Sequence, residues 1–127
     1  MSNHLHLIIS AINHDTSDIL RDFKKFTSKE IIKAVQAHPG ESRKGWMLNI
    51  FSDAGNSNSR NKEYQFWRQD NHPIELYNAA FTTQKMYYIH DNPVAAGIVD
   101  KAEAYLYSSA RDYYNGKNCG LLQLDLL

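Results

Sequence analysis

The sequence has a single cysteine, no net charge and no long apolar run. One thiol, at Cys119, excludes an internal disulfide and a zinc site built from cysteines alone. With 14 basic and 14 acidic side chains, the chain has no overall charge to attract nucleic acid, so any such site depends on a local patch. No apolar run approaches the roughly 20 residues of a membrane span, and no charged start with an apolar core marks a secretory signal. We therefore expect a soluble, cytoplasmic protein that does not engage a membrane.

Length and apolar content together predict one compact domain over residues 1–127. With 43% apolar residues, the chain is long enough to bury a core and too short for two domains. Alternating apolar and polar residues predict β-strands, and apolar residues three or four apart predict helices. The expected strands cover 2–9, 64–69, 74–77 and 121–126. The expected helices start at Thr16 or Ser17, at a capping box from Thr27 to Glu30, near Trp46, at Thr82 or Thr83, and at Ser108. Pro93 ends the helix that starts at Thr82 or Thr83. Residues Ser52 to Asn61 are expected to form a loop.

Two histidines stand two residues apart in the first of these alternating runs. In a strand, His4 and His6 share one face, whereas Leu5 and Leu7 share the other. Two neighbouring imidazoles backed by an apolar face are half of a divalent-metal site. The alternative is a pair of histidines on a solvated strand face that binds nothing.

Tyr88 and Asn92 are four residues apart in the expected helix over 84–92, so they share one helix face. An amide oxygen is a good ligand for Mg²⁺ or Mn²⁺, and a phenol becomes a nucleophile once a cation or base lowers its pKa from about 10. Packed against the histidines, this face would suit phosphodiester transfer through a covalent phosphotyrosine, with the ion stabilising charge on the phosphate. The alternative is that Tyr88 is an ordinary core aromatic. Tyr87 lies about 100° round the helix and does not share the Asn92 face, and His90, on the opposite side, is assigned no chemistry.

A locally basic stretch and one tryptophan are the candidates for contacts with nucleic acid. Lys24, Lys25, Lys29 and Arg68 predict a surface that contacts phosphates, although a solvated helix face is the alternative. Trp67 is a candidate for stacking on an unpaired base, although a tryptophan is more often part of the core.

Five ordered segments resemble the single-tyrosine HUH transposases, and together they cover nearly the whole chain. Residues 2–9 resemble the histidine–hydrophobic–histidine strand of that family, and residues 22–29 resemble the helix that follows it. Residues 66–75 resemble its tryptophan–glutamine segment, and residues 88–99 its nucleophile helix with the turn after it. Residues 105–113 are similar to the tail of the branch called REP-associated tyrosine transposases. Each motif is weak alone; together and in this order they are specific.

The resemblance implies a ferredoxin-like α/β (α+β) fold, with an antiparallel sheet and helices on one face. It also implies Mg²⁺ or Mn²⁺ as cofactor, single-stranded DNA with hairpins as substrate, and a homodimer. Residue by residue, His4 and His6 match the histidine ligands, Asn92 the third ligand and Tyr88 the nucleophile. The family usually carries a strand and a helix before the histidine strand. This sequence lacks them, so we expect the sheet without them.

The expected function is therefore DNA transposition: metal-dependent nicking and transfer of single-stranded DNA through a 5′-phosphotyrosine intermediate. One alternative is a truncated or inactive copy that binds DNA hairpins without cleaving them, using the four basic residues. A third interpretation is a small α/β domain whose histidines bind no metal.

Overall fold

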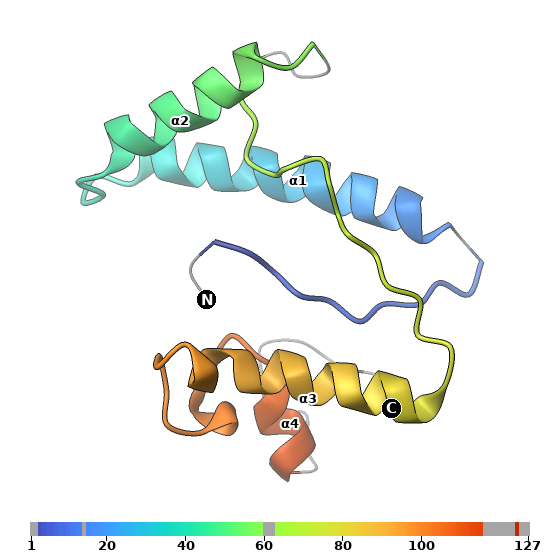
Figure 1. The fold of residues 1–127 in the computed structure, drawn as a ribbon. Helices are drawn as coiled ribbons and strands as arrows, with labels where there is room; N and C mark the ends of the chain where they lie inside the picture. The colour runs from blue at the N-terminus through green and yellow to red at the C-terminus, as the bar shows by residue number, and fades with distance from the viewer. Residues whose placement is uncertain (1–2, 14, 60–62, 116–123, 125–127) are drawn as a thin grey trace. The chain divides into compact units, whose positions relative to one another are not determined.

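The computed structural model describes residues 3–13, 15–59, 63–115 and 124. Within these ranges the chain forms four α-helices and one short 3₁₀ helix, and no strand is present (Figure 1). The helices are α1 (Thr16–Ala37), α2 (Lys44–Asn56), α3 (Ala79–Ala95) and α4 (Ala110–Asn115), with the 3₁₀ helix η1 at Ala102–Ala104. None of these described helices combines the length and the apolar character that a membrane span needs.

The predicted ferredoxin-like antiparallel sheet is therefore wrong for the described residues. A period of two in the sequence indicates an extended backbone, but a sheet also needs a neighbouring strand whose N–H and C=O groups are free. Residues 64–69 find other partners: the Gln65 N–H donates to the Phe51 carbonyl at 2.8 Å, near the end of α2. Residues 3–9 and 74–77 form no strand either. The predicted strand over 121–126 lies outside the described residues, apart from Leu124.

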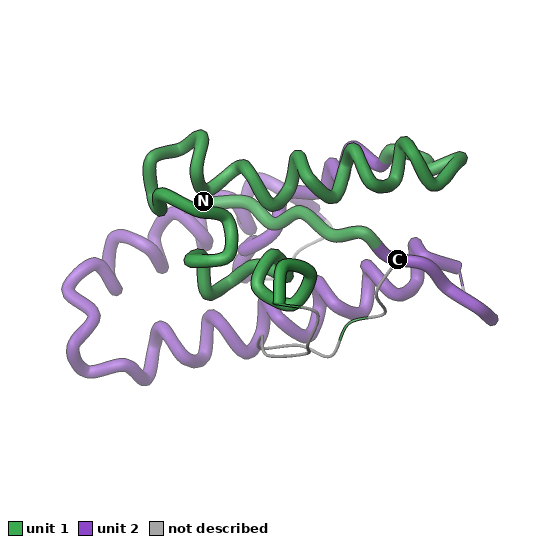
Figure 2. Tube along the Cα trace, turned by 90° about the horizontal axis from the view of Figure 1, so that it is seen from below, with its two compact units in different colours: residues 1–8, 74–127 green, residues 9–73 purple. Residues whose placement is uncertain are grey.

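The chain divides into two compact units (Figure 2). Unit 1 comprises Met1–Ile8 and Ile74–Leu127, and unit 2 comprises Ile9–Pro73. The candidate nucleophile and the two histidines belong to unit 1, and all the basic candidates belong to unit 2.

Unit 2 is built on α1 packed against α2, with the aromatic segment after α2 lying along both helices. Asp15, rather than Thr16 or Ser17, caps α1, since its carboxylate accepts from the Ser17 N–H at 2.8 Å. The predicted break at Thr27 is absent because its hydroxyl donates back to the Phe23 carbonyl at 2.7 Å, a bond that leaves the helix continuous. Likewise α2 continues to Asn56, into the predicted loop.

Unit 1 is built on α3, which starts earlier and ends later than predicted. The Asn78 side chain caps it by accepting from the Phe81 N–H at 2.8 Å, so neither Thr82 nor Thr83 is the cap. Pro93 lies inside the last turn and does not end the helix; Gly97, with a φ of 67°, follows it. The Ser108 hydroxyl accepts from the Ala110 N–H at 3.1 Å at the start of α4, which agrees with its predicted place.

Gly55 gives a test of the unit 2 packing. It is buried at the end of α2, where an added Cβ would lie 2.9 Å from the Tyr64 Cα and would collide with the Glu63 carbonyl. We expect Gly55→Ala to lower the free energy of unfolding by about 1–3 kcal/mol, measured by urea unfolding. The matched control is Gly45→Ala in the same helix, where a Cβ meets nothing within 4 Å; it should raise stability by about 0.4–1 kcal/mol. Equal stability of Gly55→Ala and the unchanged chain would contradict this packing.

Candidate functional site

The N-terminal histidines and the candidate nucleophile come together inside unit 1. The ring centroids of His4 and His6 lie 5.1 Å apart with the rings nearly perpendicular. The His6 ring in turn lies 5.9 Å from the Tyr88 ring on α3, edge to face. Residues separated by more than eighty positions in the sequence thus share one short row of rings: His4, His6 and Tyr88.

Burial alternates along the histidine segment, although the segment belongs to no sheet. His6 and Ile8 are half-buried, whereas Leu5 and Leu7 are 48% and 46% exposed. His6 thus faces α3, whereas His4 is exposed like the two leucines, so the predicted alternation is present only in part. Leu5 and Leu7 do not form the buried apolar backing that the sequence predicts.

The electrostatics of the histidine pair favour a neutral imidazole. Burial lowers the pKa of His6, and the neighbouring His4 lowers it further. A histidine whose pKa lies below its ordinary value of about 6.5 is neutral at pH 7, so its ring nitrogen keeps a lone pair that can bind a metal.

Asn92 lies one helical turn beyond Tyr88 on the same face of α3. Its Nδ2 atom is buried and has no hydrogen-bond partner in the described part of the chain. Amide oxygen and nitrogen exchange places when the amide rotates by half a turn, so the orphaned position can present a lone pair as well as an N–H. A polar group without a partner is one that a bound ion, phosphate or water can satisfy.

The donor set fits a divalent cation. The described residues contain no cluster of three or more His, Cys, Asp and Glu side chains, so the His4–His6 pair would need an amide such as Asn92 as a further ligand. Two imidazoles and one amide oxygen suit Mn²⁺ well and Mg²⁺ less well, because imidazole favours transition metals.

Tyr88 is exposed to solvent, as a nucleophile must be if a polymer substrate is to reach it. Its side chain is 57% exposed, which does not fit the alternative of a core aromatic. Tyr87 is also exposed, at 49%, but it lies about 100° round the helix from Tyr88.

The basic candidates and Trp67 all lie in unit 2, where two of them have internal partners. The Lys24 ammonium donates to the Arg68 carbonyl at 2.7 Å and to the Asn71 side chain, which ties residues 68–71 to α1. The Trp67 indole N–H donates to the Thr27 hydroxyl at 2.8 Å, and its ring contacts those of Phe23 and Phe66. These contacts fit the alternative interpretation of Trp67, that of a tryptophan that belongs to the core. Of the four basic candidates, three have exposed side chains: Lys25, Lys29 and Arg68.

His90 has a structural role that sequence reasoning missed. It is 1% exposed, its Nε2 lies 2.9 Å from the Ser109 hydroxyl, and its ring is 5.4 Å from that of Tyr113 on α4. The histidine thus attaches the back of α3 to the segment that begins α4. The available signal was the spacing from Tyr88, which placed His90 on the opposite side of the helix; the structure shows that this side is the buried one.

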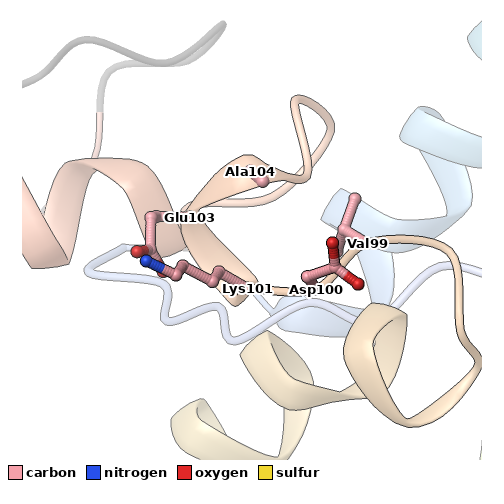
Figure 3. Close-up of a pocket in the computed structure, with 5 residues that line it drawn as sticks. All are labelled: Val99, Asp100, Lys101, Glu103 and Ala104. Carbon is pink, nitrogen blue, oxygen red and sulfur yellow. The ribbon is translucent and has the colours of Figure 1, made fainter.

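An open depression elsewhere in unit 1 contains none of the predicted residues. It is lined by Val99, Asp100, Lys101, Glu103 and Ala104 (Figure 3). Three of these five residues are charged and none is a histidine, so the depression does not extend the candidate site.

Comparison of the chain with protein-family models, with curated proteins and with solved structures gave no match.

The burial of His90 predicts a pH dependence of stability. Burial lowers its pKa, an effect that the Asp91 carboxylate opposes in part. Below the ordinary pKa of about 6.5, the unfolded chain takes up a proton that folded His90 does not, so the free energy of unfolding falls as the pH drops below that value. The fall ends once the lowered pKa of His90 is reached. We expect His90→Gln to reduce this slope in urea unfolding between pH 7.5 and 5.

The control is His72→Gln, which changes an exposed histidine in unit 2 and so separates the loss of the buried imidazole from the loss of any imidazole. His6 contributes a slope of the same sign, so that of His90→Gln should be smaller but not zero. An unchanged slope in His90→Gln would contradict the role given to burial.

Proposed function

We propose that this protein nicks single-stranded DNA and transfers the cut strand, with Tyr88 as the nucleophile and a divalent cation held by His4, His6 and Asn92. The observation that carries the proposal is the row of rings from His4 through His6 to Tyr88, at 5.1 and 5.9 Å between centroids. An exposed phenol beside paired imidazoles is the set of groups that phosphoryl transfer through tyrosine requires.

The proposed reaction has two steps, and both take place at Tyr88. The Tyr88 oxygen attacks phosphorus, and its proton passes to solvent or to a neighbouring base. A bond forms between that oxygen and phosphorus, and the bond from phosphorus to the 3′ oxygen breaks. The products are a 5′-phosphotyrosine and a 3′-hydroxyl, which takes up one proton. Attack by another 3′-hydroxyl on the phosphotyrosine then restores Tyr88 and completes strand transfer, the chemistry of DNA transposition and recombination.

His6 both orients the tyrosine and contributes to the cation site. Its edge-to-face contact restricts the Tyr88 ring, and its lowered pKa keeps the imidazole neutral. When bound, the cation would supply positive charge to a phosphate oxygen and to the departing oxygen. His4, His6 and Asn92 would hold Mn²⁺ or Mg²⁺ through two imidazole nitrogens and one amide oxygen.

The proposal includes hairpin-bearing single-stranded DNA as substrate, a homodimer as the working form, and the cytoplasm as its compartment. The exposed Lys25, Lys29 and Arg68 side chains support contacts with phosphates. Lys25 and Lys29 are four residues apart on α1 and share one face of that helix.

The direct test is a covalent adduct. We expect the unchanged chain, incubated with a labelled pool of single-stranded hairpin DNA and Mn²⁺ or Mg²⁺, to retain label on a denaturing gel. Tyr88→Phe should reduce the adduct to background, because phenylalanine has no oxygen to attack phosphorus. Tyr87→Phe, which changes the exposed neighbour, should give the adduct in full, and a chelator should abolish it.

Equal adduct yield from Tyr88→Phe would remove this tyrosine as the nucleophile. Binding of the hairpin pool with no adduct in either metal would instead favour the inactive DNA-binding copy.

A further inference from the structure

A row of aromatic and cationic side chains leads along α3 to Tyr88. The rings of Tyr77 and Phe81 are stacked, with centroids 4.8 Å apart and 17° between planes. The Lys85 ammonium lies 5.1 Å from the centroid of Phe81 and 5.9 Å from that of Tyr88. Steps of four and three residues keep Phe81, Lys85 and Tyr88 on one face of α3. Tyr77 precedes the Asn78 cap and joins this face through its stacking on Phe81. We call Tyr77, Phe81, Lys85 and Tyr88 the α3 stripe.

The Tyr77 side chain is more exposed than packing on the first turn of α3 would leave it. An aromatic residue just before the Asn78 cap that packs on the first turn resembles a hydrophobic staple. A staple explains the contact with Phe81 on one ring face, but the Tyr77 side chain is still 71% exposed. Its other face is therefore open, on a residue whose position the stacking already restricts.

An open aromatic face followed by an ammonium matches the repeating chemistry of a nucleic-acid strand. Bases stack on exposed aromatic rings, and lysine contacts the phosphate between them. In duplex DNA the base faces are covered by neighbouring pairs, so a stacking site of this kind selects single strands. The rise along α3 from Phe81 to Tyr88 is about 10 Å, and the Tyr77 ring lies 4.8 Å from the Phe81 ring. One short stretch of strand can therefore contact both Tyr77 and Tyr88.

We propose that the α3 stripe is a subsite for single-stranded DNA, in which Tyr77 stacks on a base and Lys85 contacts a phosphate beside the one attacked by Tyr88. This inference rests on the function proposed above and adds residues that bind the strand rather than react with it. Phe81 supports the Tyr77 ring, and Lys85 lies between that support and the nucleophile.

The test measures binding without cleavage. The probes are a fluorescent 20-nucleotide oligothymidine and an abasic oligonucleotide of the same length, which carries the phosphates without the bases. Anisotropy titrations are run with a chelator present, at several salt concentrations, so that no result depends on the cation or on adduct formation.

Tyr77→Ala should weaken binding of oligothymidine about five-fold or more, the lower end of one base stack, and should leave the abasic probe nearly unchanged. Lys85→Gln should weaken binding of both probes and reduce the slope of log affinity against log salt by about 0.7, the value for one phosphate on a single strand. The matched controls are Tyr87→Ala, an exposed tyrosine of α3 off the stripe, and Lys101→Gln, an exposed lysine of unit 1. Both controls should bind as the unchanged chain does, and circular dichroism verifies that every variant is folded.

The stacking role would be overturned if Tyr77→Ala bound oligothymidine as tightly as Tyr87→Ala does. It would also be overturned if Tyr77→Ala lost affinity equally for both probes. Lys85→Gln with an unchanged salt slope would overturn the phosphate contact. The two readouts separate this inference from the proposed chemistry, because anisotropy reports on Tyr77 and Lys85 whereas the adduct reports on Tyr88. Stripe-dependent binding by a chain that forms no adduct would retain the subsite and reject the nucleophile.

Discussion

The edge-to-face contact between His6 and Tyr88 is the interaction on which the candidate site depends. It joins the N-terminal segment to α3 and links the histidine pair to the phenol within unit 1. An aromatic pair of this kind contributes only about 0.5–1.5 kcal/mol beyond the area that it buries. The assembled site is thus held by a modest interaction, and a cation that binds His4 and His6 would add free energy to the same arrangement.

Buried side chains on the other side of α3 fix the helix that carries Tyr88 more firmly than the ring contact does. His90 and Pro93 on the inner face of α3 are fully buried, and His90 reaches Ser109 at the start of α4. The other face of the helix presents exposed Tyr88 and half-buried Lys85. One helix therefore carries both the anchoring side chains and the side chains proposed to act on DNA. This division allows the reactive face to remain solvated without loss of the packing that fixes the helix.

Sequence patterns predicted the helices better than their ends, and they wrongly predicted a sheet where the described residues form none. The apolar spacing of Ile19, Leu20 and Phe23 located α1, but Thr27 could either cap a new helix or bond back to the previous turn, and only the folded chain selects between these. Alternation around His4 and His6 indicated which side chains share a side, but pairing depends on distant backbone groups that no local pattern contains. For the candidate site, the shared face of Tyr88 and Asn92 followed from their spacing. The approach of His6 to Tyr88 could be anticipated only from the resemblance, and the role of Lys85 only from the ring geometry.

The most direct test of the central claim is whether a cation bound at the N-terminal histidines lies next to the nucleophile. Substoichiometric Mn²⁺ can be added to protein with ring-labelled tyrosine, and the signal of Tyr88 identified among the eight tyrosines by its loss in Tyr88→Phe. The account predicts that Mn²⁺ broadens the Tyr88 signal first and that His6→Ala abolishes this preference. Broadening of Tyr88 that is the same in His6→Ala, or a Tyr88 signal that stays sharp while Mn²⁺ is bound, would contradict it.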